Sequence, residues 1–541
     1  LKQLNKNLLD LPVEHIINLL YYTAVCGYDD VIDHLNLEVS SFSGRQDAEL
    51  LKLEKKVLDA RNIVNKTLLH LASARQFEKV VKFLVTQGTS IEASDTEGAT
   101  ALYFASQGGY YKIVEFLVTE GAEINREKMN GVTALFIASQ YGHIKVVECL
   151  LGLGANPNQP RDNGATPLHV ACEFGHTEIT ELLVASGADI EHGRLDGITP
   201  LFTASQFGQI NVVERLLALG ADLNHPRDNG AVPLHVACEL GHETIIELLL
   251  TSGAEVDSHR TDGITPLFTA CQYGQTRIAK GLLVLGANPN QLRDTNATPL
   301  HVACEFGHDE IVELLVTSGA EINFARLDGV TPLYTASHCG QIKIVKRLLA
   351  LGANVDQCRI NGATPLHIAC ECGHEEIVEY LVASGAEINR GRIDGITPLF
   401  TACEFGQTKI AGRLLTLGAD PNQQRDIGAT PLHVASEFGH EEIIELLVAS
   451  GAEINRARLD GVTPLHTASH CGQIKVVERL LALGANINQR RNTGATPLHI
   501  ACEFGHDEII EILVASGADI NLVTSFDRSP LSVALEKKQN C

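Results

Sequence analysis

Cysteine and histidine recur four residues apart along this chain of 541 residues, a spacing that raises the question of metal binding. The pairs are Cys172/His176, Cys238/His242, Cys304/His308, Cys370/His374 and Cys502/His506. A zinc site needs four ligands within about 2.3 Å of the ion, whereas neighbouring helices pack about 8–10 Å apart. A glycine between each Cys and its His also ends the helix that carries the Cys. We therefore predict no metal site, with Cys as a small core residue and His at a helix end.

A second histidine recurs in the motif TPLH and raises the question of hydrolytic chemistry. It stands at His70, His169, His235, His301, His367, His433, His466 and His499. A hydrolase needs a single triad beside a pocket, but alternate copies of this position hold Phe202, Phe268, Tyr334 and Phe400. Phenylalanine cannot act as a general base, and no glycine-rich phosphate loop is present. We predict that the chain is not an enzyme and uses no cofactor.

The composition excludes other functions. The chain carries 42 Lys and Arg against 66 Asp and Glu, a formal net charge of −24. Such an acidic chain is a poor general nucleic-acid binder, because phosphate contacts need a basic face. No apolar run reaches the roughly 18 residues of a membrane helix, and no signal peptide is visible. The chain begins with Leu1 rather than Met, so we expect a fragment or a processed product.

The residues that could do chemistry lie in a repeat, whose anchor we take as the Thr of TPLH. Anchors follow one another every 33 residues without insertion. They are Thr67, Thr100, Thr133, Thr166, Thr199, Val232, Thr265, Thr298, Thr331, Thr364, Thr397, Thr430, Thr463 and Thr496, and Ser529 opens a fifteenth, partial copy.

Each part of the repeat has a physical reason. Pro167 suits the first turn of a helix, and the hydroxyl of Thr166 can cap that helix. Gly175 is predicted to end helix one in a left-handed conformation. Apolar residues at helical spacing around Ile179 predict helix two, which ends near Gly187, and an extended loop follows. One copy cannot bury its own apolar face, whereas stacked copies bury a continuous one.

This pattern resembles the ankyrin repeat family over about 67–541, through the TPLH motif, the small residues after it, the Gly-His pair, the paired Leu and the closing "GAxxN". The resemblance implies an all-α, superhelical repeat solenoid of stacked helix-turn-helix units with β-hairpin finger loops. It implies that the TPLH histidines make hydrogen bonds between neighbouring repeats. It also implies that partner proteins bind in the groove between the fingers and helix one.

The domain limits follow from the repeat. We expect residues 1–66 to form a helical N-terminal cap with a degenerate repeat, and 67–528 to form fourteen repeats. Residues 529–541 would hold helix one of a partial repeat, whose exposed apolar face indicates that the native chain continues.

The cysteines indicate the compartment. Those six residues after the anchor are Cys172, Cys238, Cys271, Cys304, Cys370, Cys403 and Cys502, and Ser takes the same position in other repeats. Neighbouring repeats hold them farther apart than the roughly 7 Å between Cα atoms that a disulfide bridges. We predict reduced thiols and a cytosolic or nuclear protein.

The repeats alternate between two types, so the duplicated block is 66 residues. Type 1 repeats read "GATPLHVACEFGH" and type 2 repeats read like "DGITPLFTASQFGQ". Twelve residues after the anchor, type 1 carries Glu178, Glu310, Glu376, Glu442 and Glu508, and type 2 carries Lys145, Arg277, Lys343, Lys409 and Lys475. The alternation is consistent with ion pairs between repeats, with control of register, or with gene duplication alone.

Two sets of residues are candidates for partner binding. The first set is aromatic and lies eight residues after the anchor, next to Glu or Gln in most copies: Phe174, Phe207, Tyr273, Phe306, Phe405, Phe438 and Phe504. Exposed rings would be good anchors for a partner; the alternative is that they pack on neighbouring fingers.

The second set lies five residues before the anchor, where ankyrin repeats usually have Asp, as at Asp95. It comprises Arg161, Arg194, Arg227, Arg260, Arg293, Arg326, Arg359, Arg392, Arg425, Arg458 and Arg491, which we call the arginine ladder. Either it binds a partner, or it pairs with the Asp that lies one or two residues after nine of the eleven.

The sequence therefore predicts a non-enzymatic scaffold that binds protein partners along the groove. The alternative is a cytoplasmic ankyrin spring or tether of a larger membrane or cytoskeletal protein. The groove repeats nearly unchanged, which favours a periodic or extended partner, including an acidic one, that makes many weak contacts in series.

Overall fold

The computed structural model of the chain describes residues 66–540, with side chains as far as residue 536. The helical cap predicted for 1–66 therefore lies outside the described residues, except for Lys66. The chain divides into two compact units, Leu1–Pro266 and Leu267–Cys541, and each is described by itself.

The start and end of helix one follow from local chemistry. Thr166 has an extended backbone with φ −94° and ψ 170°, and Pro167 occupies the first helical position. Gly175 ends the helix with a φ of 77°, in the left-handed region that suits glycine. In type 2 repeats the hydroxyl of Thr199 accepts a hydrogen bond from the N–H of Phe202. The predicted glycine termination is confirmed at Gly175, and a threonine cap is seen at Thr199, whereas the hydroxyl of Thr166 lies 2.9 Å from Nδ1 of His169.

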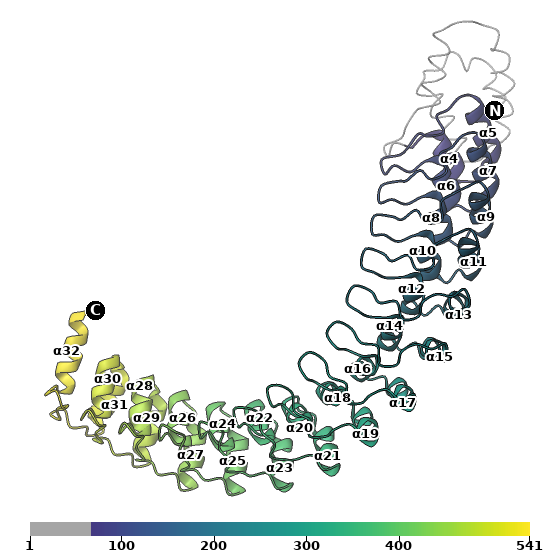
Figure 1. The fold of residues 1–541 in the computed structure, drawn as a ribbon. Helices are drawn as coiled ribbons and strands as arrows, with labels where there is room; N and C mark the ends of the chain where they lie inside the picture. Colours follow the sequence, from purple (N-terminus) through teal and green to yellow (C-terminus); the bar gives the residue numbers. More distant parts are fainter. Residues whose placement is uncertain (1–65, 541) are drawn as a thin grey trace, which may run out of the picture. The chain divides into compact units, whose positions relative to one another are not determined.

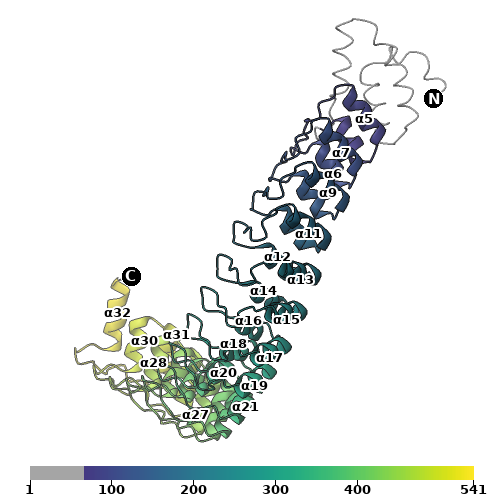
Figure 2. The same cartoon turned by 45° about the vertical axis from the view of Figure 1, so that its right-hand side comes forward.

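Unit 1 consists of successive helix pairs, and each helix contacts both its pair-mate and its counterpart in the next repeat. Figures 1 and 2 show the first helices of this unit in one row and the second helices in a parallel row. The first helices are α4 (Leu68–Ala74), α6 (Ala101–Gln107), α8 (Ala134–Gln140), α10 (Pro167–Phe174), α12 (Pro200–Gln206) and α14 (Pro233–Leu240). The second helices are α5 (Glu78–Thr86), α7 (Tyr111–Thr119), α9 (Ile144–Gly152), α11 (Thr177–Ala185), α13 (Ile210–Ala218) and α15 (Glu243–Thr251).

Unit 2 repeats this organisation, and α16 begins at its boundary. Its first helices are α16 (Pro266–Gln272), α18 (Pro299–Phe306), α20 (Pro332–His338), α22 (Pro365–Cys372), α24 (Pro398–Glu404), α26 (Pro431–Phe438), α28 (Pro464–Cys471), α30 (Pro497–Phe504) and α32 (Pro530–Asn540). Its second helices are α17 (Thr276–Val284), α19 (Asp309–Thr317), α21 (Ile342–Ala350), α23 (Glu375–Ala383), α25 (Thr408–Thr416), α27 (Glu441–Ala449), α29 (Ile474–Ala482) and α31 (Asp507–Ala515). Helix α32 opens the partial copy after Ser529 and packs on α30.

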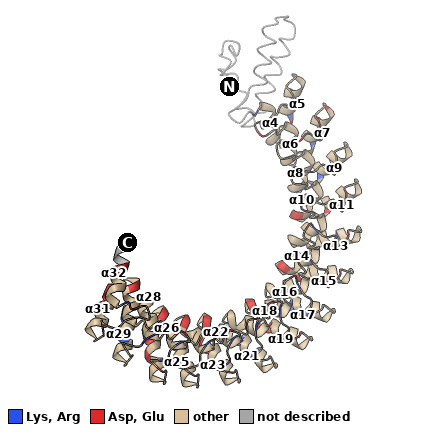
Figure 3. Ribbon diagram, turned by 60° about the vertical axis from the view of Figure 1, so that its left-hand side comes forward, with Lys and Arg blue, Asp and Glu red and all other residues tan. Residues whose placement is uncertain are grey.

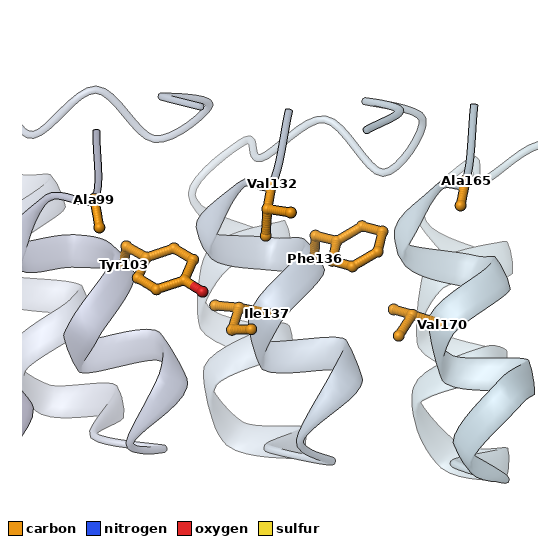
Figure 4. Close-up of a cluster of buried hydrophobic side chains, with 7 residues drawn as sticks. All are labelled: Ala99, Tyr103, Val132, Phe136, Ile137, Ala165 and Val170. Carbon is orange, nitrogen blue, oxygen red and sulfur yellow. The ribbon is translucent and has the colours of Figure 1, made fainter. Parts of the chain in front are cut away.

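The core is continuous from repeat to repeat because side chains of one helix one fill the space beside the next. Figure 4 shows Phe136 of α8 extending towards Val170 and Ala165 of the following repeat. Tyr103 of α6 packs in the same way towards Val132 and Ile137. These side chains are at least nine-tenths buried, so apolar burial between repeats stabilises the stack.

The loops that join the repeats form stacked fingers. Each finger holds two successive turns, and no β-strand occurs in residues 66–540, so the β-hairpin detail of the prediction is not seen there. The fingers stack closely: Gly395 has a φ of 78°, and a Cβ built there would lie 2.9 Å from the Cα of Arg425 in the next finger. A glycine is needed at this position for its backbone conformation and for its lack of a side chain.

Asparagine side chains link the bases of successive loops. The Oδ1 of Asn389 accepts a hydrogen bond of 2.9 Å from the N–H of Asp420, and Asn422 does the same for Glu453 at 2.8 Å. The "GAxxN" ending of the repeat therefore connects each repeat to the next.

None of the helices within residues 66–540 has the length and apolarity that a membrane crossing requires.

Candidate functional site

The TPLH histidines form structural links between repeats. His169 is 2% exposed, and its Nε2 lies 2.9 Å from the backbone oxygen of Ile198 in the next repeat. A carbonyl oxygen only accepts, so Nε2 carries the proton and Nδ1 accepts the N–H of Thr166 at 3.2 Å. Burial lowers the pKa of His169 from 6.5 to about 4, although the Ile198 contact opposes the shift. The predicted hydrogen bond between repeats is confirmed, and the imidazole is neutral at pH 7.

In alternate repeats an aromatic ring takes this place and an arginine of the ladder covers it. The guanidinium of Arg425 lies 5.3 Å from the centre of the Phe400 ring, which is 2% exposed. The other arginine–ring pairs, at 5.5 to 5.6 Å, are Arg161 with Phe136, Arg227 with Phe202, Arg293 with Phe268 and Arg359 with Tyr334. These distances suit cation–π contacts.

The ladder arginines of the intervening fingers pair with aspartate. Arg392 lies 3.2 Å from Asp394, which also accepts the N–H of Ile396 at 3.2 Å. The equivalent pairs, at 3.0 to 3.4 Å, are Arg194 with Asp196, Arg260 with Asp262, Arg326 with Asp328 and Arg458 with Asp460. Arg491 donates instead to the hydroxyl of Thr493 at 2.9 Å.

Every member of the arginine ladder thus has a partner within the chain. All except Arg161 are partly buried between stacked fingers. Contacts within the chain, one of the two interpretations of the ladder, are therefore present, and partner binding by these arginines stays a prediction.

The predicted groove rings lie at the end of helix one and remain half exposed. Their exposed fractions are 48% for Phe174, 47% for Phe207, 48% for Tyr273, 50% for Phe306, 50% for Phe405, 51% for Phe438 and 44% for Phe504. We call these residues the ring row. The same position holds Leu240, which is 49% exposed, and the partly buried Cys339, Cys372 and Cys471. About half of each ring is covered and half faces solvent, so the rings are not fully buried against neighbouring fingers.

Histidines of the Gly-His pairs fix several of these rings. Phe306 stacks on His308 with ring centres 6.5 Å apart and an angle of 11° between the planes. The Nε2 of His308 lies 3.2 Å from the carbonyl oxygen of Gln272, in the preceding repeat. Phe438 stacks on His440 in the same way, at 6.3 Å. Phe306 and Phe438 are thus each stacked on a histidine of their own repeat, with ring surface left open to solvent. Phe207, Tyr273 and Phe405 are followed by Gly-Gln instead of Gly-His.

An acidic residue precedes five of the seven rings, Gln206 and Gln272 precede the other two, and no lysine or arginine lies on any helix one from α4 to α30. In unit 2 the acidic residues are Glu305, Glu371, Glu404, Glu437 and Glu503, and Figure 3 shows acidic positions in red along the row that includes α18, α22 and α26. Burial raises the pKa of Glu404; Arg392 and Arg425 lower it, and Glu371 and Glu437 raise it further. Neighbouring carboxylates thus lie close enough to repel one another.

The Cys–His pairs with four-residue spacing do not come together as sets of metal ligands. Cys172 is fully buried, which raises the pKa of its thiol to about 12, while His176 stacks on Phe174 at the helix end. Within residues 66–540, no group of three or more His, Cys, Asp or Glu side chains is placed to hold a metal ion. The cysteines of this part of the chain are free thiols.

The second helices carry the alternating charges. Arg413 of α25 lies 2.7 Å from Glu379 of α23, and Lys409 lies 4.0 Å from Glu375. Arg479 and Lys475 of α29 contact α27 in the same way, at 2.7 Å from Glu445 and 3.8 Å from Glu441. Helices α25 and α29 therefore pair with the type 1 helix two before them, and Lys346 of α21 lies 2.7 Å from Glu376 in the type 1 helix after it. Ion pairs between repeats were one of the sequence interpretations, although Lys409 and Lys475 contact Glu375 and Glu441 rather than Glu376 and Glu442.

The sequence reasoning missed one feature, a set of apolar residues at the finger tips. Four residues before the anchor, Leu327, Ile360 and Ile393 of adjacent fingers are 68%, 70% and 74% exposed. Leu195 and Leu459 occupy the same position elsewhere, at 77% and 74%. The pattern that could have revealed them is an aliphatic residue directly after the ladder arginine, in a loop that is otherwise polar.

The paired helices and the bonded junctions define a helical repeat solenoid, and each unit exposes rings at the ends of its first helices. The family model "Ankyrin repeats (3 copies)" matches residues 20–128, 125–194, 191–260, 234–326, 318–392, 385–458 and 455–524. The chain therefore belongs to the ankyrin repeat family, a fold that is typically non-enzymatic and that supports protein–protein interaction.

A solved structure similar to part of this chain is the crystal structure of the human ASB11 ankyrin repeat domain. The two share 31% sequence identity, and the match covers 41% of this chain and 99% of that one, with a TM-score of 0.39. A search of curated proteins found no significant match.

Proposed function

We propose that the chain is a protein-interaction scaffold that binds its partner along the ring row. The observation that carries the proposal is the contrast between two sets of rings. Phe400, between the repeats, is 2% exposed, whereas Phe405 and Phe438, at the end of helix one, are 50% and 51% exposed. Rings with half of their surface in water gain apolar contact on binding, and an aromatic side chain has few rotatable bonds to fix.

In this proposal the arginine ladder belongs to the framework of the scaffold rather than to its binding surface. Its support is that both kinds of ladder contact, Arg425 on Phe400 and Arg392 with Asp394, lie within the chain. Neutralising ladder residues is therefore expected to change stability before it changes partner binding.

The expected partner is a protein, and the regular row favours one that is extended or periodic. Weak contacts at successive repeats would then add through effective concentration. The net charge of −24 argues against nucleic acid. Free, buried thiols such as Cys238 and Cys370 suit a reducing compartment, so we place the scaffold in the cytosol or nucleus.

The test uses the full chain as bait in a cell lysate, followed by cross-linking and mass spectrometry. The ring variant replaces Phe306, Phe405 and Phe438 with Ser. A matched control replaces Val284, Leu285 and Leu417 with Ser; these residues are exposed, apolar and located at the end of helix two. Circular dichroism melting is used to check that both variants fold.

We expect at least one protein to be captured by the wild type and by the control, and to be lost from the ring variant. Its cross-links should reach helix one and the fingers. A ring variant that captures the same proteins as the wild type would overturn the proposal.

A further inference from the structure

In the ring row of unit 2, negative charge lies next to exposed rings. Glu305 directly precedes Phe306, Glu404 precedes Phe405 and Glu437 precedes Phe438. The first helices of unit 2 up to α30 contribute no lysine or arginine to balance them. A partner on this face therefore meets half-exposed rings beside negative charge.

Two basic residues that act on this face are engaged within the chain. Arg392 and Arg425 lower the pKa of Glu404, but their contacts are with Asp394 and with the Phe400 ring. Glu371 and Glu437, from the repeats on either side, raise that pKa. The added positive charge of a ligand would reduce this repulsion.

A ring beside a carboxylate is suited to a cationic side chain. The face of an aromatic ring attracts an ammonium or guanidinium group, and the carboxylate adds an ion pair. Arginine suits both contacts best, because its planar group stacks on a ring and donates to a carboxylate at its edge. His308 and His440 already stack on Phe306 and Phe438, which leaves the rest of each ring for the ligand.

We propose that the ring row of unit 2 binds an extended, arginine-rich segment of the partner protein, and this inference rests on the proposed function. This proposal differs from the sequence-based expectation of an acidic partner, which relied on the arginine ladder. Each helix-one glutamate forms one station and takes one cationic side chain. A ring completes the station at Glu305, Glu404, Glu437 and Glu503, whereas Cys372 follows Glu371.

The geometry of the stack sets the spacing of the cations. Equivalent positions in neighbouring repeats lie about 8–10 Å apart. A polyproline II chain has three residues per turn and rises about 3.1 Å per residue, so every third side chain lies on the same face, about 9 Å further on. A cation at every third residue of such a chain therefore matches the adjacent carboxylates Glu371, Glu404 and Glu437. The step from Glu305 to Glu371, over two repeats, needs about six residues by the same spacing.

The test measures binding of fluorescent peptides of about 15 residues to the full chain by anisotropy, at low and high salt. The probe repeats Arg-Gly-Ser. A second peptide has the same composition with its arginines in one block, and a third replaces Arg with Glu. One variant, which we call the groove variant, carries Glu371→Gln, Glu404→Gln and Glu437→Gln. A matched control carries Glu310→Gln, Glu442→Gln and Glu508→Gln, which are exposed on helix two and change the net charge equally.

We expect the spaced arginine peptide to bind more tightly than the block peptide, and the glutamate peptide not to bind. The groove variant should weaken the spaced peptide about tenfold and reduce its salt dependence, and the control should change affinity less than twofold. Equal weakening by the two variants, equal affinity for the spaced and block peptides, or preference for the glutamate peptide would overturn the inference.

Capture of the cellular partner by the two variants distinguishes failure of this inference from failure of the proposed function. If the Phe-to-Ser ring variant loses that partner while the Glu-to-Gln groove variant retains it fully, the scaffold function stands and the basic partner does not. If the ring variant also retains the partner, both fail.

Discussion

Two kinds of junction between neighbouring repeats alternate along the stack. Both are formed by the residue three positions after the anchor, but their chemistry differs. In a type 1 repeat, His367 is 1% exposed and its Nε2 lies 3.0 Å from the carbonyl oxygen of Ile396 in the next repeat. In the following type 2 repeat, Phe400 occupies the same position, 2% exposed, and Arg425 of the next finger lies over its ring.

The type of contact between neighbouring repeats therefore recurs every 66 residues, as the sequence does. One junction depends on a hydrogen bond to a backbone carbonyl, which any following repeat supplies. The other depends on apolar burial and on a side chain of the following finger. The two therefore respond differently to acid, to salt and to substitution, and the predictions below use those differences.

Acid should produce the largest effect, because it acts on all the type 1 junctions together. Burial lowers the pKa values of His169, His235, His301, His367 and His433 to about 4, and that of type 2 His466 likewise. The ordinary value is 6.5, so the unfolded chain binds protons first as the pH falls. The stabilisation is complete above pH 6.5 and is lost as the pH falls through 4, at up to roughly 3 kcal/mol per histidine.

Urea unfolding followed by circular dichroism between pH 7.5 and 4 measures this loss. We expect the midpoint to fall steeply below pH 6.5. A midpoint that stays constant down to pH 4.5 would contradict the assignment of neutral, buried imidazoles.

Replacing one histidine should sharpen the comparison. His367→Phe leaves the carbonyl of Ile396 and the N–H of Thr364 without their imidazole partner, at a cost of about 1–3 kcal/mol at pH 7.5. The variant no longer takes up that proton on unfolding, so its deficit relative to the wild type should shrink at pH 4.5.

The comparator is Phe400→Leu, which should cost about 1 kcal/mol at both pH values, because no titrating group is lost. Urea midpoints at the two pH values test both variants. An equal deficit for His367→Phe at both values would show that His367 does not titrate on unfolding.

Deleting one repeat should have a smaller effect that exposes the pairing of types. Removing 397–429 brings two type 1 repeats together, so Glu379 loses Arg413 and Glu375 loses Lys409. Removing 397–462 instead brings Arg479 and Lys475 into the places of these two cations. The shorter deletion should therefore be the less stable chain, by about 1 kcal/mol, although it retains more repeats.

Thermal melting at 0.1 M and at 1 M salt tests this order. The difference should vanish at high salt, because exposed ion pairs are screened. If the two deletions melt alike at low salt, the charge alternation has no energetic role and reflects duplication alone.

Much of this architecture could be predicted because its determinants are local. Thr166, Pro167 and Gly175 specify the limits of helix one through backbone chemistry that involves neighbouring residues. The hydrogen bond of His169 followed from the resemblance to ankyrin repeats, and its geometry supplied the tautomer and the lowered pKa.

The partners of the ladder could not be predicted, because they depend on distances between repeats. Asp426 follows Arg425 directly and Asp394 follows Arg392 by two residues, so sequence indicated aspartate for both. In the structure, Arg392 forms an ion pair with Asp394, whereas Arg425 lies over the ring of Phe400, 25 positions earlier in the chain. Exposure of Phe405 and Ile393 likewise depends on how closely fingers and helices pack, which no short motif encodes.

The two kinds of ladder contact provide the smallest and most specific test. Arg392→Gln removes an ion pair whose side chains are 22% and 48% exposed, and should cost about 0–1 kcal/mol at low salt and almost nothing at 1 M salt. Arg425→Gln removes a guanidinium from a buried ring, at about 0.5–1 kcal/mol, and much of that cost should persist in salt because planar stacking contributes to it. Double-mutant cycles with Asp394→Asn and Phe400→Leu isolate each coupling energy. Coupling energies of zero in both cycles, together with loss of partner capture by the arginine variants, would reassign the ladder from framework to binding surface. Measurable coupling with unchanged capture would leave recognition to the rings and carboxylates of helix one.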